Sequence, residues 1–275
     1  MSDARLSPFS GRFALETLRG QVEAEAFVPG EPARIGTSVV DLSTKPEGGR
    51  DRQLLYGAEV VVIERRGESA FVQAQADGYC GWITAQAVAP PSPATHVVAT
   101  RGTHLYREAS IKRGEHGALS LGARLTVLDQ AGDLARTPEG WVPARHLRPI
   151  DLPETDPVSV AERLLGAPYL WGGNASFGID CSGLVQLAYA LCHRACPGDS
   201  DLQRAAFGDF LPEDTSTQRG DLFFWAGHIA IAVSPDLLLH ANGHAMAVVY
   251  EPIDGCLARI AASGEARWFG RKRPV

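Results

Sequence analysis

The chain has 275 residues, of which 45% are hydrophobic, and a formal net charge of −6 at pH 7. This length suits about two to three domains of ordinary size, and the apolar content is sufficient for packed cores. A nucleic-acid partner is disfavoured, because the only dense basic run is Arg271-Lys272-Arg273 at the C-terminal end. No stretch approaches the roughly 18 apolar residues of a membrane span, so we expect no membrane-spanning segment.

Residues 1–32 are predicted to form a leader with one helical piece, Ala14 to Phe27, which ends at Pro29-Gly30. Glutamate and arginine side chains interrupt every apolar run of this leader, whereas a secretion signal needs an apolar core of roughly 7–15 residues. We therefore expect a cytoplasmic protein. The five cysteines have irregular spacing, which is not typical of a disulfide framework or a zinc finger, so we expect no metal ion and no other cofactor.

Two segments of similar pattern follow, at residues 33–91 and 94–150. Each contains short strands with period-2 alternation, a Gly-Ala turn into an apolar strand, and a Gly-Trp dipeptide near its end. The dipeptides are Gly57-Ala58 and Gly81-Trp82 in the first segment and Gly122-Ala123 and Gly140-Trp141 in the second. Short alternating strands between glycine-rich turns predict small all-β barrels. The layout resembles two bacterial SH3-like domains in tandem.

The two segments differ beside the Gly-Trp dipeptide. Tyr79 in the first segment aligns with Pro138 in the second, so only the first segment offers a phenol hydroxyl at this turn. Taken alone, Tyr79 is best interpreted as an aromatic residue on the surface of a barrel.

Residues 154–275 differ in character, with helical patterns first and strand patterns later. One helix is predicted to open at Asp156-Pro157, because proline suits the first helical turn, and a second helix is predicted to begin at Cys181. Strand-like runs follow a loop rich in proline, glycine and aspartate, and they span 222–225, 228–233, 237–240 and 247–250. This order predicts an α+β domain.

Three side chains of this segment have the types needed for nucleophilic catalysis. Cys181 stands at a helix start, where unpaired N–H groups and the helix dipole favour a thiolate, although the charge of Asp180 opposes it. His228 begins an alternating strand, and His240 ends the next strand. Adjacent antiparallel strands would bring the imidazoles together, with His228 as base and His240 as its orienting partner. Each residue alone is more often structural, and the combination is what points to catalysis.

The motifs around these residues resemble those of the NlpC-type, papain-like cysteine peptidases that cut bacterial cell-wall peptides. The matching stretches are Pro168-Tyr-Leu-Trp-Gly-Gly173, Gly178-Ile-Asp-Cys-Ser-Gly183, Asp199-Ser200-Asp-Leu-Gln203, Arg219-Gly-Asp-Leu-Phe-Phe-Trp225, Gly227-His228-Ile-Ala-Ile and Leu239-His240-Ala-Asn242. With two SH3-like segments upstream, the chain is similar to the γ-D-glutamyl-L-diamino acid endopeptidases. The resemblance implies an α+β papain-like domain at 154–275 with a triad of Cys181, His228 and His240.

The resemblance also implies a substrate. These peptidases hydrolyse the bond from γ-D-Glu to diaminopimelate or lysine in murein stem peptides whose N-terminal L-Ala is free. By the matching motifs, Asp180 would pair with the alanine ammonium, and Tyr169, Ser182 and Ser200 would line the dipeptide pocket. Tyr79 would close that pocket. A site built for an ammonium rejects an acylated N-terminus, because Asp180 would stay desolvated and unpaired, which favours released peptides and murein recycling.

Two other functions are left open. One is a cell-wall-binding SH3-like module with an inactive catalytic domain, but none of the triad residues is lost. The other is an amidase- or acyltransferase-type reaction on the same papain-like fold, which the cysteine-first order and the histidine at position 240 disfavour. Gly198 stands where relatives often carry arginine, so the sequence predicts no specific contact to the D-Glu carboxylate.

Overall fold

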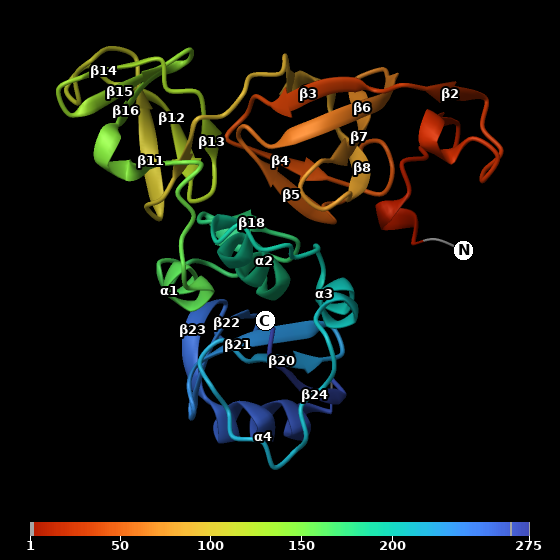
Figure 1. Ribbon diagram of the computed structural model, residues 1–275, viewed down its shortest axis with the longest axis vertical. Helices are drawn as coiled ribbons and strands as arrows, with labels where there is room; N and C mark the ends of the chain where they lie inside the picture. The colour runs from red at the N-terminus through yellow and green to blue at the C-terminus, as the bar shows by residue number, and fades with distance from the viewer. Residues whose placement is uncertain (1–2, 265, 275) are drawn as a thin grey trace. The chain divides into compact units, whose positions relative to one another are not determined.

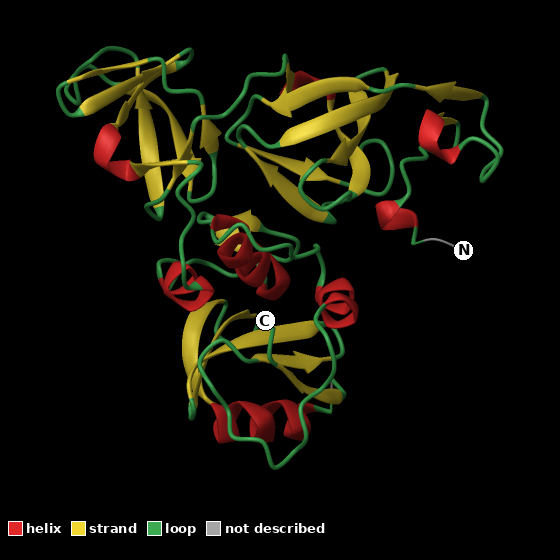
Figure 2. Ribbon diagram, in the orientation of Figure 1, coloured by secondary structure: helices red, strands yellow, loops and turns green. Residues whose placement is uncertain are grey.

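The protein is described by a computed structural model that covers residues 3–264 and 266–274 (Figure 1). The chain divides into two compact units, residues 1–152 and residues 153–275. The α-helices α1 to α4 all belong to the second unit, and the first unit consists of strands, loops and short 3-10 helices (Figure 2). Within the described ranges, no helix has the length and apolar character needed to cross a membrane.

The leader is not helical between Ala14 and Phe27, so this expectation was wrong. Strands β1 (Phe13–Leu15) and β2 (Ala26–Val28) pair in parallel, and the short 3-10 helices η1 (Ala4–Leu6) and η2 (Glu16–Leu18) accompany them. Gly20 has a φ of +80°, which ends any helix there. The apolar side chains of this leader pack against a cluster formed by Ile63, Phe71, Cys80 and Trp82, and that tertiary contact overrides the local helical pattern.

The first half of the N-terminal unit forms two antiparallel sheets from residues 31–89. Its elements are β3 (Glu31–Ile35), β4 (Val39–Leu42), β5 (Arg52–Leu55), β6 (Glu59–Arg66), β7 (Ser69–Ala74), β8 (Cys80–Thr84), η3 (Ala85–Ala87) and β9 (Val88–Ala89). One sheet has the order β8-β7-β6-β3-β9, and β4 pairs with β5 in the other. Glycine suits position 81, because a Cβ there would lie 2.1 Å from Leu42 Cδ2.

The second half repeats four of the strand pairings of the first half in the same chain order. Its elements are β10 (His96–Val98), β11 (Gly102–Tyr106), β12 (Glu115–Ser120), β13 (Arg124–Leu125), β14 (Asp129–Ala131), β15 (Leu134–Thr137), β16 (Gly140–Pro143), η4 (Ala144–His146) and β17 (Leu147–Pro149). The pairs β3–β6, β3–β9, β4–β5 and β7–β8 recur as β10–β13, β10–β17, β11–β12 and β15–β16. A 3-10 helix precedes the last strand in both halves.

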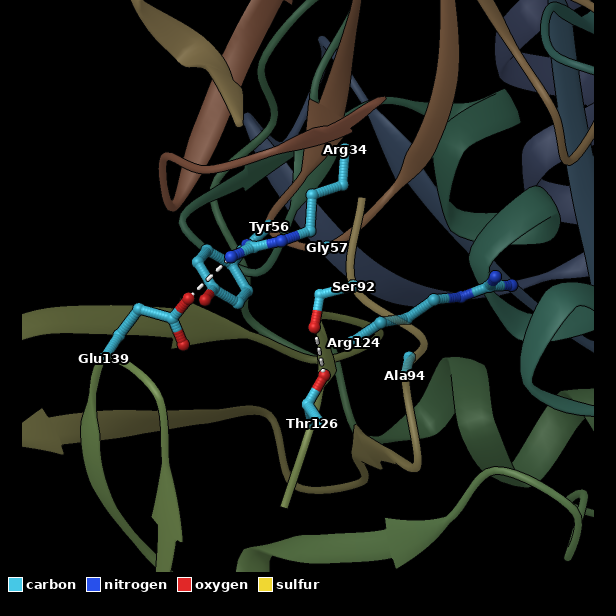
Figure 3. A pocket seen from close by; sticks show the side chains of 8 residues that line it. All are labelled: Arg34, Tyr56, Gly57, Ser92, Ala94, Arg124, Thr126 and Glu139. Carbon is cyan, nitrogen blue, oxygen red and sulfur yellow. Dashed lines mark hydrogen bonds and ion pairs between the residues drawn. The ribbon is translucent and has the colours of Figure 1, made fainter. Parts of the chain in front are cut away.

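The two halves pack together through Tyr56 and an ion pair. Tyr56 belongs to the first half but is buried in the core cluster of the second, beside Val98, Leu105, Leu119, Ala123, Leu125 and Val142. The guanidinium of Arg34 lies over the ring of Tyr56, and its Nη2 is 2.6 Å from Glu139 Oε1 (Figure 3). The cavity at this junction measures about 10 Å³, which is about the space of one water molecule. It is too small to bind a substrate.

The C-terminal unit is an α+β domain, as expected, and it is built on one five-stranded antiparallel sheet, one strand more than the sequence predicted. Its elements are α1 (Pro157–Glu162), β18 (Asn174–Ala175), β19 (Gly178–Ile179), α2 (Cys181–Leu191), α3 (Ser200–Ala206), β20 (Leu222–Trp225), β21 (His228–Ser234), β22 (Leu237–Asn242), β23 (Ala247–Pro252), α4 (Ile253–Ser263) and β24 (Trp268–Lys272). The sheet order is β23-β22-β21-β20-β24, and α2 and α4 lie on opposite faces of it (Figure 1).

Helix α4 packs on the sheet face that carries the small residues of β21. Ala230 and Ala232 form one core cluster with Ile253, Cys256 and Ile260 of α4. The small side chains of β21 therefore leave room for another element, and that element is α4. The sequence reasoning had not predicted α3, α4 or β24.

Candidate active site

Cys181 is the first residue of α2, and Asp180 caps that helix. Asp180 Oδ1 accepts hydrogen bonds from the N–H of Gly183 (2.7 Å) and from the hydroxyl of Ser182 (2.9 Å). Its Oδ2 accepts a hydrogen bond from the N–H of Gly172 (2.9 Å). A capping aspartate satisfies N–H groups that have no carbonyl partner within the helix. The cap therefore fixes the backbone that carries the thiol.

Glycines let the β18–β19 hairpin approach the first turn of α2 closely. A Cβ on Gly183 would lie 2.4 Å from the carbonyl oxygen of Gly173. A Cβ on Gly173 would in turn lie 2.4 Å from the carbonyl oxygen of Gly178. Real Cβ atoms do not approach an oxygen so closely, so this part of the motif needs residues without a side chain.

The two candidate histidines meet across the antiparallel strands β21 and β22. Nε2 of His228 lies 2.8 Å from Nδ1 of His240. His240 is only 1% exposed, whereas His228 is half-buried and lies beside the ring of Trp225. This contact occupies Nε2 of His228, which leaves its Nδ1 as the ring nitrogen open to another partner.

The thiol of Cys181 lies against the first residues of β21. Its Sγ is 4.0 Å from the carbonyl oxygen of Gly227, and the N–H of Ile229 also acts on the sulfur as a hydrogen-bond donor. These two residues flank His228 in the chain. The structure therefore brings the candidate nucleophile to the end of β21 that carries the candidate base.

The thiol and both imidazoles are neutral near pH 7. Burial, reinforced by the like charge of Asp180, raises the pKa of the Cys181 thiol to about 12. Burial lowers the pKa of His228 to about 3 and that of His240 to about 4. The sequence favoured a thiolate at the helix start, but desolvation outweighs the N–H groups near the sulfur. A nucleophilic role for Cys181 would therefore require proton transfer to accompany its attack, as in general-base catalysis.

A chain of polar contacts continues beyond His240. Its Nε2 lies 3.0 Å from Glu251 Oε2, and Arg259 binds the same carboxylate through Nε (2.8 Å) and Nη2 (2.7 Å). Asn242 Nδ2 also lies 2.9 Å from His240 Nε2. The sequence reasoning missed Glu251 and Arg259. Alternation along β23 was an available indication, because it puts Glu251 on the same face as Val249, the ladder partner of His240.

His240, Glu251 and Cys256 offer three ligand atoms within 4.8 Å of one another, which is a spacing that could suit a metal ion. The guanidinium of Arg259 already lies there, because it contacts Glu251 and also lies 3.8 Å from Cys256 Sγ. Burial raises the pKa of the Cys256 thiol to about 12, so this residue is not a ready thiolate ligand. A metal ion would have to displace a cation that the site already holds.

Tyr169, Asp180 and Ser182 lie together around the thiol. Burial raises the pKa of the Tyr169 hydroxyl to about 12, and the charges of Cys181 and Asp180 act in the same direction. Burial raises the pKa of Asp180, and the negative charge of Asp199 acts in the same direction. The three hydrogen bonds that Asp180 accepts lower its pKa and so oppose these two effects. The carboxylate of Asp180 therefore lies at the start of α2 within the field of a second carboxylate, and this negative charge would attract a cationic group of a ligand.

The other two expected pocket residues lie on other elements. Ser200 begins α3, which is tied to α2 because Gln203 Nε2 donates a hydrogen bond to the carbonyl oxygen of Ser182 (2.9 Å). Tyr79 lies in the N-terminal unit and is fully buried, so its interpretation as a surface aromatic was wrong. Its hydroxyl donates to Asp51 Oδ2 (3.0 Å) and its ring faces the guanidinium of Arg52. The contact of Tyr79 with a dipeptide in the C-terminal unit stays a prediction.

Two parts of the chain match known families. Residues 166–259 match the NlpC/P60 family, and residues 42–88 match the bacterial dipeptidyl-peptidase SH3 domain. The first range contains the thiol and both candidate histidines, and the second covers most of the first half of the N-terminal unit.

Curated relatives match the chain over about two thirds of its length or over about one third of it. Dipeptidyl-peptidase 6 of Lysinibacillus sphaericus is 28% identical over 225 residues, which are 69% of this chain and 79% of the relative. The γ-D-glutamyl-L-lysine dipeptidyl-peptidase of Bacillus cereus is 25% identical over 224 residues, 70% of this chain and 67% of the relative. A probable endopeptidase of Mycobacterium tuberculosis is 35% identical over 102 residues, which cover only 26% of that relative.

The fold is similar to that of a solved structure. The crystal structure of an NlpC/P60 family protein from Bacillus cereus superposes with a TM-score of 0.74 and 21% identity, and covers 88% of this chain and 99% of the other. The likeness concerns the fold, and the sequence matches concern two regions of the chain. The chain therefore combines a region that matches the bacterial dipeptidyl-peptidase SH3 domain with a region that matches the NlpC/P60 family.

Proposed function

We propose that the protein hydrolyses the bond from γ-D-Glu to diaminopimelate or lysine in murein stem peptides that have a free N-terminal L-Ala. The observation that carries this proposal is the carboxylate of Asp180 beside the thiol of Cys181, with the negative charge of Asp199 acting on Asp180. A negative pocket next to a nucleophile suits a peptide whose ammonium lies close to the scissile bond. Two relatives of this chain are named for dipeptidyl release, one of them for the γ-D-glutamyl-L-lysine bond.

The proposed reaction begins with a proton transfer. As Sγ of Cys181 attacks the γ-carbonyl carbon of D-Glu, the thiol proton moves to Nδ1 of His228. His240 holds the ring of His228 during this transfer. When the C–N bond breaks, the imidazolium of His228 gives its proton to the leaving amine of the diamino acid, and a thioester remains. Water then attacks the thioester and gives a proton to His228. When the C–S bond breaks, His228 returns this proton to Sγ of Cys181, which restores the thiol.

The proposed specificity depends on the free amine of the substrate. Asp180 Oδ2 accepts one hydrogen bond within the protein, so it retains a lone pair for the ammonium. An acylated alanine lacks that cation and leaves the half-buried carboxylate without its partner, which costs about 1–3 kcal/mol. In our proposal Tyr169, Ser182 and Ser200 line the pocket, and Tyr79 closes it. Substrates are then released peptides, which suits murein recycling in the cytoplasm.

We also propose that both halves of the N-terminal unit are SH3-like barrels, at residues 33–91 and 94–150. The repeated strand pairings and the matching positions of η3 and η4 support a duplication. The matched SH3 region covers the first half only. The catalytic domain in this proposal spans 154–275. A crystal structure of residues 94–150 with an open, unclosed sheet would contradict this assignment.

The proposed activity is tested by mass spectrometry of the products from L-Ala-γ-D-Glu-diaminopimelate, its lysine counterpart, their N-acetylated forms and intact sacculi. We expect the dipeptide L-Ala-D-Glu to appear from the free peptides only. Cys181→Ala should release none while the protein still unfolds at the same temperature. Equal rates on free and acetylated peptides would refute amine recognition, and wall binding without any peptide release would favour a binding module instead.

A further inference from the structure

Glu251 and Arg259 lie behind the two histidines and are not required by the triad itself. Glu251 is half-buried in β23, and its carboxylate contacts His240 on one side and the fork of Arg259 on the other. The bidentate contact with Arg259 lowers the pKa of Glu251 to about 2, so the carboxylate is ionised near pH 7. An ionised carboxylate only accepts hydrogen bonds.

The charge of Glu251 decides which nitrogen of each imidazole carries the proton. Because Glu251 only accepts, His240 must carry its proton on Nε2, and its Nδ1 is then a lone pair. The 2.8 Å contact between the rings requires His228 to donate from Nε2 to that lone pair. The remaining nitrogen of His228, Nδ1, is then unprotonated and able to take the thiol proton.

Asn242 offers a competing donor at the same nitrogen. Its Oδ1 accepts a hydrogen bond from the N–H of Ala245 (2.7 Å), which turns the amide nitrogen towards His240 Nε2 at 2.9 Å. That nitrogen cannot both donate to Glu251 and accept from Asn242. The bond to the anionic carboxylate is the stronger of the two, so the charge of Glu251 overrides the amide.

We propose that Glu251, held by Arg259, is a positioning residue that sets the tautomers of His240 and His228 and so keeps Nδ1 of His228 free to act as the base. This inference depends on the proposed function only for its kinetic readout. If a neutral glutamine replaced Glu251, Arg259 would donate to its single carbonyl oxygen. Asn242 would then donate to His240 Nε2. Both rings would then shift to the Nδ1-protonated form, which cannot accept the thiol proton.

The test is Glu251→Gln, which keeps the size of the side chain and removes the charge. We expect kcat to fall by about 10- to 100-fold with KM unchanged, because the residue does not touch the substrate. The loss should persist across the active pH range, since the wrong tautomer is not corrected by titration. Glu154→Gln is the matched control, because Glu154 makes a 2.8 Å ion pair with Arg163 in the same unit. It should keep full kcat.

A second readout is independent of any substrate. Long-range ¹H–¹⁵N NMR spectra identify the protonated nitrogen of each imidazole. We expect Nε2 in both histidines of the wild-type protein and of Glu154→Gln, and Nδ1 in both histidines of Glu251→Gln. Unchanged tautomers or unchanged kcat in Glu251→Gln would overturn the inference. If the wild-type protein cleaves no stem peptide, the proposed function fails, and the NMR result still decides the role of Glu251.

Discussion

The N–H of Gly183 donates to Asp180 Oδ1 over 2.7 Å, so the group that caps α2 is also the negative group beside the nucleophile. One carboxylate thus has a structural task and a proposed binding task. The cap needs an acceptor oxygen, whereas pairing with an ammonium needs a charge. Substitutions that remove one property and keep the other separate the two tasks.

Asp180→Asn retains an acceptor oxygen and removes the charge. Asparagine keeps the Oδ1 acceptor of the cap but cannot accept from the N–H of Gly172, so the free energy of unfolding should fall by about 1 kcal/mol, whereas Asp180→Ala loses all three bonds and should fall further. In Asp180→Asn we expect KM for the free peptide to rise by about 10- to 100-fold, the value of one charge-assisted hydrogen bond. Urea unfolding and steady-state kinetics measure the two effects. An unchanged KM would show that Asp180 serves only as the cap.

Gly183→Ala should destabilise the C-terminal unit. Alanine in a helix is ordinarily about 0.5–1 kcal/mol better than glycine. Here the new Cβ would lie 2.4 Å from the carbonyl oxygen of Gly173, and such overpacking costs about 1–3 kcal/mol, so we expect a net loss. Gly255→Ala in α4 is the control, because its Cβ would find only Pro252 Cβ at 4.0 Å. Urea unfolding should show opposite signs for the two variants.

The pH profile of kcat/KM should extend further into acid than that of an ordinary imidazole base. His228 must be neutral to accept the proton, and burial lowers its pKa to about 3, so activity should be retained at pH 5. The alkaline limb should follow the substrate ammonium, with a pKa of about 7.7–8.0, since Asp180 needs the charged amine. Initial rates between pH 4 and 9 test this. An acid limb near 6.5 would mean that His228 titrates as an exposed imidazole.

The same histidines should make folding weaker in acid. The pKa of His228 falls from 6.5 to about 3 on folding, and that of His240 falls from 6.5 to about 4. Below pH 6.5 the unfolded chain therefore binds protons that the folded chain does not, and the free energy of unfolding decreases until the pH reaches the folded values. Urea unfolding at pH 7 and pH 5 measures the decrease. His228→Gln should show a smaller decrease than the wild-type protein.

Glu139→Gln should weaken the junction between the halves of the N-terminal unit. The pair of Arg34 and Glu139 is mostly buried, with side chains 14% and 29% exposed, so the substitution leaves a desolvated guanidinium. We expect a loss of about 1–3 kcal/mol in the free energy of unfolding. Glu31→Gln is the control, because it breaks an exposed ion pair with Arg65. It should change the free energy of unfolding by less than about 1 kcal/mol. Equal losses in both variants would contradict a special role of the junction.

Local patterns in the sequence predicted the elements that carry the candidate triad. The strand expected at 222–225 has the bounds of β20, and the helix expected at Cys181 begins there because Asp180 caps it. Alternation placed the two histidines on neighbouring strands, and the structure joins their rings. Each of these features depends on residues close together in the chain, which is why a pattern reveals them.

The parts that the sequence did not reveal depend on tertiary contacts. Glu251 reaches His240 through the register of β22 and β23, and Arg259 reaches Glu251 only because α4 folds back on the sheet. The spacing of Ile253, Cys256 and Ile260 is helical and could have indicated α4. The protonation of the thiol depends on burial, which no local motif contains.

A protonated, buried sulfur has a consequence for the lifetime of the protein. Peroxide and electrophiles react with thiolates far faster than with thiols, so the resting Cys181 should resist conversion to sulfenic acid. Sensitivity to these oxidants would then rise only while a peptide occupies the site and the proton is being removed. The reactive thiolate of Cys181 would in this way be present only during turnover.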